Sequence, residues 1–239
     1  MPEDLQKLLN LNVLNVTENA GYEGIDDFPR VGFDLKGNVD YIALFNNRND
    51  YHKTSNTCLG FYNYDSVIDG KNGIYWSIYF GDKRQMKKYK TMFKGIRYAI
   101  EPDYSQCGDI PIEENRYRCF RARVVNVWLT MECNILVFPN ISYVNKRSSE
   151  YIFEGIMPYS TVAFSLKGMM KNKEDAALIK EGIKETVDKI HPRKIIIYTT
   201  SGNKRKINEL FKYAIVNNIK LIVPDNRLLL LNKKSDRIS

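Results

Sequence analysis

Short runs of β-branched and aromatic residues alternate along the chain with stretches of helical periodicity. Each such run predicts a strand, and the runs cover 40–45, 73–80, 97–102, 134–139, 160–166, 194–199 and 220–224. Apolar residues spaced by three and four predict helices within 111–133, 176–190 and 207–215. A shorter, very basic helix is expected over 82–94, and the segment 145–155 is a further helix candidate.

Strands separated by helices are typical of parallel pairing, because a right-handed crossover between parallel strands needs a covering helix. Several of the runs are apolar on both faces, as expected where helices cover a sheet. We therefore predict an α/β fold, a single domain of repeated β-α units with a mainly parallel sheet. Its length of 239 residues favours an incomplete or irregular TIM-like barrel over a doubly wound open sheet.

The distribution of charge suggests three parts: an acidic N-terminal extension packing on the body (1–34), the α/β domain (35–226) and a basic C-terminal tail (227–239). Acidic residues stand near the N-terminus where a secretion signal has basic ones. No apolar run approaches the roughly 20 residues that span a bilayer. We therefore expect a cytoplasmic protein without membrane contact.

The net charge of +8 is concentrated after residue 70. Residues 1–70 hold five Lys and Arg against eleven Asp and Glu, whereas residues 71–94 hold seven against one. A basic body with an acidic leading segment attracts polyanions, which makes nucleic acid a candidate partner. The alternative is that the lysines only keep the surface soluble. The candidate phosphate-binding residues are Arg48, Lys83, Arg84, Lys87, Lys88, Arg118, Arg121 and Lys167.

Polar residues follow the predicted strands, and in a parallel barrel they would meet at one mouth. Oxygen ligands there suit Mg²⁺ or Mn²⁺, and a metal can activate water for phosphodiester hydrolysis. The candidate metal ligands are Asp82, Asp103, Asn140 and Asp225. Asp and Asn are also the residues that cap helices and form turns, so capping is the competing interpretation for each.

Asp103, Asp82 and His52 are the candidate catalytic residues. His52 lies in the polar stretch 46–57, which is long enough for a lid or a binding loop. The sequence lacks a Walker-type loop, a G-x-G-x-x-G motif and a G-x-S-x-G elbow. Its four cysteines are far apart, which predicts reduced thiols rather than a zinc site.

The order of several short motifs resembles the family called domain of unknown function 4417, which is found in phages, plasmids and other mobile elements. The resemblance covers roughly residues 35–225 and implies a bacterial host cytosol as the setting. The family usually has two consecutive acids where this chain has Gly81 and Asp82, which weakens a two-metal site built on Asp82. The motifs are "YFGDKRQ" (79–85), "PDYS" (102–105), "IP" (110–111), "NRYRCFRAR" (115–123), "VFPN" (137–140), "FEGIMPYSTVAFSLKG" (153–168) and "HPRKIIIYTT" (191–200).

Two functions follow from these observations. The first is a phage or mobile-element protein that binds nucleic acid or a host protein without catalysis. The alternative is a metal-dependent hydrolase of a phosphodiester or nucleotide, with its site at the C-terminal ends of the strands.

Overall fold

Parallel strands and covering helices form an α/β protein in the computed structural model, which describes residues 16–32, 37–169 and 172–235. The strands of the two main sheets are β3 (Tyr41–Leu44), β4 (Thr57–Gly60), β5 (Tyr98–Ile100), β6 (Leu136–Phe138), β7 (Thr161–Ser165), β8 (Lys194–Tyr198), β9 (Lys220–Ile222) and β10 (Asp225–Asn226). The helices are α3 (Asp65–Ile68), α4 (Ile74–Tyr79), α5 (Lys83–Met92), α6 (Ile112–Cys133), α7 (Lys173–Ile190), α8 (Lys204–Leu210), α9 (Lys212–Val216) and α10 (Arg227–Ser235).

Every strand pair in the two main sheets is parallel. One sheet has five strands in the order β10-β3-β4-β5-β6, and the other has three in the order β7-β8-β9. A separate antiparallel pair, β1 (Tyr22–Glu23) and β2 (Phe28–Pro29), precedes them. The predicted α/β class with mainly parallel strands is therefore confirmed.

The two sheets approach each other at two places. An isolated parallel bridge joins Asn140, just after β6, to Ala163 in β7. At the other side the chain passes directly from β9 into β10, which pairs with β3. The described strands nevertheless form two separate sheets and no closed barrel, so the TIM-like barrel favoured by the sequence is not confirmed.

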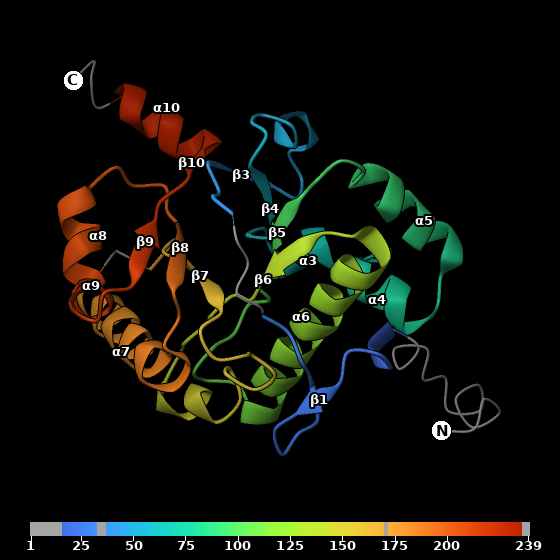
Figure 1. Ribbon diagram of the computed structural model, residues 1–239, viewed down its shortest axis with the longest axis horizontal. Coiled ribbons are helices and arrows are strands. Elements are labelled where there is room, and N and C mark those ends of the chain that lie inside the picture. The colour runs from blue at the N-terminus through green and yellow to red at the C-terminus, as the bar shows by residue number, and fades with distance from the viewer. Residues whose placement is uncertain (1–15, 33–36, 170–171, 236–239) are drawn as a thin grey trace.

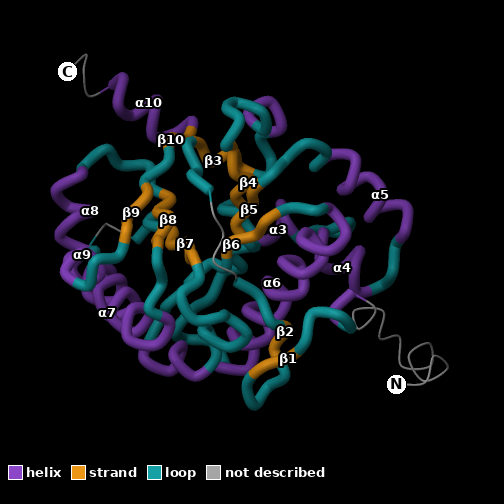
Figure 2. Tube along the Cα trace, in the orientation of Figure 1, coloured by secondary structure: helices purple, strands orange, loops and turns teal. Residues whose placement is uncertain are grey.

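Alternate side chains of the strands point to opposite faces and build separate cores. One set, which includes Ile42, Cys58, Phe138 and Ile196, forms a buried cluster shared by strands of both sheets. The other set packs against helices: α4, α5 and α6 cover the five-stranded sheet, and α7, α8 and α9 cover the three-stranded one. Figure 2 shows the strands of the two main sheets gathered in the middle with the helices around them. This two-faced burial explains why the strands are apolar on both faces.

One predicted strand is wrong: residues 73–80 contain helix α4 rather than a strand. Their aromatic and β-branched composition suggested a strand, but Ile74, Tyr75 and Ile78 are buried at spacings of one and four. That spacing fits one side of a helix. The helix ends before Gly81, which adopts a φ of 64°.

Other segments depart from the expected pattern in smaller ways. The 3₁₀ turn η1 (Arg48–Asp50) lies in the stretch 46–57 expected to be a polar loop, and β4, which was not predicted, begins at the end of that stretch. The candidate helix at 145–155 is a 3₁₀ turn, η2 (Lys146–Glu150). In the predicted N-terminal extension, Phe28 and Val31 are buried in the core beside α6 and α7. Positions 1–15 and 33–34 of that extension and 236–239 of the predicted tail lie outside the described residues.

Among the helices of the described segments, we find none with both the length and the apolar character to cross a bilayer.

Candidate functional site

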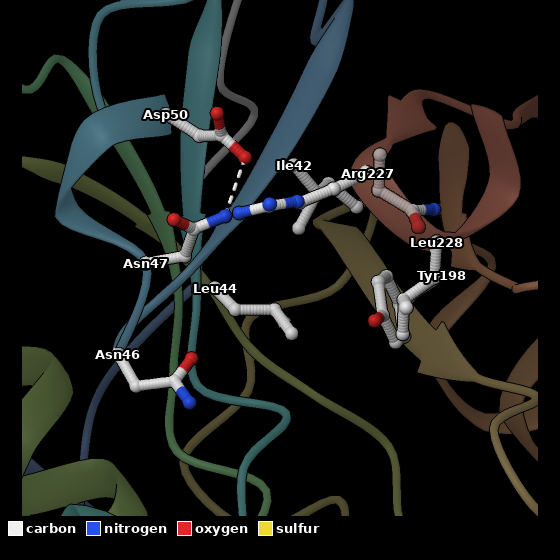
Figure 3. A pocket seen from close by; sticks show the side chains of 9 residues that line it. Ile42, Leu44, Asn46, Asn47, Asp50, Tyr198, Arg227 and Leu228 are labelled. Carbon is white, nitrogen blue, oxygen red and sulfur yellow. Dashed lines mark hydrogen bonds between the residues drawn. The ribbon is translucent and has the colours of Figure 1, made fainter. Parts of the chain in front are cut away.

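Two cavities lie at the C-terminal ends of the strands. The first has a volume of about 370 Å³ and is lined by residues that follow β4, β5, β6 and β7; we call it the Asp103 cavity. The second, of about 300 Å³, lies where β3, β8 and β10 end; we call it the Asp50 cavity (Figure 3). Tyr62 lines the first and Tyr198 the second, and their rings stack with centroids 4.5 Å apart.

The carboxylate of Asp103 is held from one side. Asp103 follows β5, and its Oδ1 accepts hydrogen bonds from Asn140 Nδ2 at 2.8 Å and Ser142 Oγ at 2.5 Å. Both donors come from the segment after β6. The other oxygen, Oδ2, accepts no hydrogen bond from the residues that the structure describes. Asp103 thus offers one open acceptor to the cavity that it lines.

Enclosure within the protein raises the pKa of Asp103 to about 6, because burial disfavours the charged carboxylate. The hydrogen bonds from Ser142 and Asn140 lower the pKa, but they do not offset this desolvation. The negative charges of Asp65 and Glu101 raise it further. The carboxyl is therefore mostly charged at neutral pH and takes up a proton near pH 6. A pKa close to neutral pH is suited to proton transfer.

A buried polar network fixes the segment that carries Asn140. The Glu101 carboxylate forms an ion pair with Arg123, and its Oε1 also accepts from the backbone N–H of Asn140 at 2.9 Å. Its Oε2 accepts from Asn126 Nδ2 at 3.0 Å. Arg123 donates in turn to the carbonyl of Ile152 at 2.7 Å. Each charged group in this network has a partner, which is the condition for tolerating charge in a core.

Tyr62 sets the orientation of the Asn140 amide. Its hydroxyl donates to Asn140 Oδ1 at 3.0 Å, which directs the amide nitrogen toward Asp103. Burial raises the pKa of Tyr62 well above its usual value, so the hydroxyl stays protonated and remains a donor. The geometry around Asp103 is therefore determined by residues from three strand ends.

A cation and an exposed ring lie at the rim of the Asp103 cavity. Lys167, after β7, donates from Nζ to the carbonyl of Tyr62 at 3.0 Å, and Nζ lies 5.7 Å from the ring centroid of Tyr64. Lys167 forms no ion pair with any residue that the structure describes. Tyr64 is 78 % exposed. The cavity therefore combines an open carboxylate oxygen, an unneutralised cation and an aromatic surface.

The Asp50 cavity is built from the segment after β3 on one side and from β8, β10 and α10 on the other (Figure 3). Asp50 Oδ2 accepts from Asn47 Nδ2 at 2.5 Å and from the Tyr41 hydroxyl at 3.0 Å. Burial and this hydrogen bond raise the pKa of Tyr41 to about 12. Arg227 and Tyr198 also line this cavity.

The predicted metal ligands are not brought together as a set of four. Asp103 and Asn140 are in contact, but Asp82 caps α5 by accepting from the N–H of Gln85 at 2.9 Å. Asp225 pairs with Lys233 at 2.8 Å. Across residues 16–32, 37–169 and 172–235, no group of three or more His, Cys, Asp or Glu side chains is placed to hold a metal ion. Binding of Mg²⁺ or Mn²⁺ by Asp103 and Asn140 stays a prediction.

His52 and Arg48 also lie away from Asp103. His52 is exposed after η1, close to Gly95, and Arg48 begins η1. The catalytic role predicted for His52 is not tested by this placement, but His52 is not among the residues that line either strand-end cavity.

The arginines predicted to clamp phosphate on α6 are already paired within the protein. Arg118 contacts Asp65 at 2.6 Å and Glu114 at 2.9 Å. Arg121 lies 3.4 Å from Asp69 and stacks over the ring of Tyr104, 4.3 Å from its centroid. These contacts fit the structural interpretation of the α6 arginines better than phosphate binding.

The basic residues of α5 are arranged differently. Lys83, Arg84, Lys87 and Lys88 are exposed and lie on one side of the helix, opposite the buried Tyr89. None of the four forms an ion pair with the described residues, whereas Lys90 pairs with Glu132 at 2.6 Å. We refer to Lys83, Arg84, Lys87 and Lys88 as the α5 cationic face.

Sequence reasoning located Asp103, Asn140 and Lys167 but missed the groups that orient them. Glu101 and Arg123 each carried a signal, since a charged residue inside an otherwise apolar strand or helix face needs a buried partner. Ser142 and Tyr62 carried none, because their contacts with Asp103 and Asn140 join segments far apart in the chain.

Comparison with known proteins gives a family and two phage relatives. The Gene 1 proteins of Mycobacterium phage L5 and Mycobacterium phage D29 are 28% and 29% identical to this chain over 105 residues, which is 44% of this chain. The matched segment covers 45% and 38% of those two proteins, so less than half of their length is compared. No solved structure matches significantly. Residues 21–219 match the family model described as "Domain of unknown function (DUF4417)", and the chain belongs to that family.

Proposed function

We propose that this protein binds the backbone of nucleic acid through the α5 cationic face. The observation that carries the proposal is that four exposed cations share one side of a helix without neutralising partners among the described residues. Lysines and arginines that displace counterions from phosphates provide the sequence-independent part of nucleic-acid affinity. The phage setting of the relatives is compatible with such a partner.

Helix α7 provides the contrast that makes this face distinctive. Three of its exposed lysines are neutralised locally: Lys180 pairs with Glu209 at 3.2 Å, Lys184 with Asp188 at 2.7 Å and Lys189 with Glu185 at 3.8 Å. A solubilising surface of this kind carries both signs of charge side by side. The α5 cationic face has only one sign, which favours attraction of a polyanion.

Charge removal on α5 tests the proposal. A triple variant with Lys83→Gln, Lys87→Gln and Lys88→Gln lowers the net charge from +8 to +5. We expect its affinity for DNA or RNA, measured by fluorescence anisotropy at several salt concentrations, to fall at least about tenfold. The slope of log affinity against log salt concentration should become less steep by about one for each lysine that contacts phosphate.

A matched variant on α7 is the control for net charge. Lys180→Gln, Lys184→Gln and Lys189→Gln remove the same three charges, and we expect affinity for nucleic acid close to that of the unaltered protein. Equal losses in the two triple variants would show that only net charge matters. If the unaltered protein binds no nucleic acid at low salt, the proposal is wrong and a host protein becomes the partner to seek.

We further infer that the two sheets act as one interrupted ring of the TIM-like kind. The bridge between Asn140 and Ala163, the passage from β9 into β10 and the shared inner cluster of both sheets support this inference. In such a ring the strand ends share one mouth, and both cavities open there.

The metal-dependent hydrolase stays the alternative prediction. Of its four predicted ligands only Asp103 and Asn140 lie together, and Asn140 directs its nitrogen rather than its oxygen toward Asp103. No contact among the described residues specifically favours it over binding.

A further inference from the structure

The Asp103 cavity contains polar groups that binding at α5 does not use. Oδ1 of Asp103 is occupied by two donors, and Oδ2 is open. The side-chain amide of Asn63 lines the same cavity, and its buried Oδ1 has no hydrogen-bond partner. An open carboxylate oxygen and an unpaired amide oxygen in one cavity call for a ligand that donates a hydrogen bond to each.

The remaining walls specify the shape and charge of such a ligand. Phe164 and Ile141 give the cavity an apolar side, and the exposed ring of Tyr64 stands at its rim. Lys167 brings a positive charge next to Tyr64. A volume of about 370 Å³ falls within the range of small-molecule sites, about 300–1,000 Å³. The cavity thus suits a planar, amine-bearing ring attached to an anion.

We propose that the Asp103 cavity binds a guanine nucleotide. The exocyclic amine of guanine donates to Asp103 Oδ2, and its neighbouring ring N–H donates to Asn63 Oδ1, which otherwise has no partner. The base stacks on Tyr64, as bases do on aromatic side chains, and the phosphate lies at Lys167. This site is separate from the α5 cationic face and does not depend on it.

The preference for guanine follows from the two acceptors, Asp103 Oδ2 and Asn63 Oδ1. Guanine presents two adjacent N–H donors, whereas uracil has a single ring N–H flanked by carbonyl oxygens, so one carbonyl would face an acceptor. A carbonyl facing a carboxylate would leave two acceptors in contact without a donor between them. The site should therefore discriminate against uracil nucleotides.

Titration calorimetry with AMP, CMP, GMP and UMP tests the base. We expect GMP to bind at least about tenfold more tightly than UMP, with AMP and CMP weaker than GMP because each has only one of the two donors. Asp103→Asn should abolish that preference, because the neutral amide offers both a donor and an acceptor. Thermal unfolding of the variant checks that it folds, and Tyr64→Ala, which changes an exposed ring, provides a second test that should weaken all four nucleotides.

Lys167→Gln separates phosphate recognition from base recognition. We expect it to remove the advantage of GMP over guanosine while leaving the preference for GMP over UMP. The triple variant on α5 serves as the control and should bind mononucleotides as the unaltered protein does, so that failure of one site is distinguishable from failure of the other. The proposal is overturned if GMP does not bind at millimolar concentration, if UMP binds as tightly as GMP, or if Asp103→Asn keeps the preference.

Discussion

At the scale of single residues, Asp103 differs from the other strand-end aspartates in what surrounds its carboxyl. Asp225 is neutralised by Lys233, and Asp82 is occupied in capping a helix. Asp103 has only neutral donors on one oxygen and none on the other. Its carboxylate is therefore the one that the fold leaves least stabilised and most available.

The raised pKa of Asp103 predicts how stability depends on pH. The folded protein holds this proton up to about pH 6, whereas the unfolded chain loses it near pH 4. Between these values the folded state binds more protons, so the contribution of Asp103 to the free energy of unfolding falls as pH rises. The free energy of unfolding of Asp103→Asn, measured with urea relative to the unaltered protein, should therefore rise by about 1–3 kcal/mol from pH 4 to pH 7.

Asp188→Asn is a control with the opposite sign. Hydrogen bonds from Lys184 and Tyr213 lower the pKa of Asp188, so its contribution is present above the unfolded pKa and is lost in acid. This variant should lose stability relative to the unaltered protein as pH rises from about 3 to 5. A gain for Asp103→Asn that does not change with pH would contradict the burial assigned to its carboxyl.

At the scale of elements, the strand pattern could be predicted where the runs were apolar on both faces. Runs at 40–45, 97–102, 134–139, 160–166, 194–199 and 220–224 each contain a strand. The strand predicted at 73–80 is wrong because its aromatic and β-branched composition is typical of a strand, whereas the four-residue spacing of the buried Ile74 and Ile78 is helical. Strand β4 was missed because Thr57–Gly60 is short and follows a polar stretch.

Asp82 is an element-scale test of capping against catalysis. Its carboxylate accepts from the N–H of Gln85 at the start of α5. We predict that Asp82→Ala destabilises the protein by about 0.5–2 kcal/mol in urea unfolding, the usual effect of losing such a cap. Asp82→Asn, which keeps an acceptor oxygen, should lose much less.

Nucleotide binding in the Asp103 cavity should be the same in both Asp82 variants. Loss of a metal-dependent activity in Asp82→Asn, with stability retained, would show a role for Asp82 beyond capping and favour the hydrolase.

At the scale of the whole molecule, the prediction that strand ends converge was partly useful. It placed Asp103, Asn140 and Lys167 near one another, because parallel strands present their C-terminal ends on one side of a sheet. It could not show that Asp82 and Asp225 stay apart, since their positions depend on how α4 packs and where β10 pairs. The donors to Asp103 come from the segment after β6, and Tyr62 after β4 orients one of them, Asn140; these contacts are specified only by tertiary packing.

Charge is also organised at this scale. The α6 arginines are neutralised by acids in the first half of the chain, such as Asp65 and Asp69. Three α7 lysines, Lys180, Lys184 and Lys189, are neutralised by acids on α7 and α8. The excess positive charge is therefore not spread evenly. Within the described residues, the α5 cationic face is one place where it remains unneutralised.

Lysine reactivity tests the central claim most directly. Acetylation of lysine amines is measured by mass spectrometry at low salt, with and without a saturating oligonucleotide. We predict that the oligonucleotide protects Lys83, Lys87 and Lys88 several-fold and leaves Lys180, Lys184 and Lys189 unchanged. Protection of the α7 lysines to the same degree, or no protection on α5 under conditions where the oligonucleotide is bound, would contradict the account.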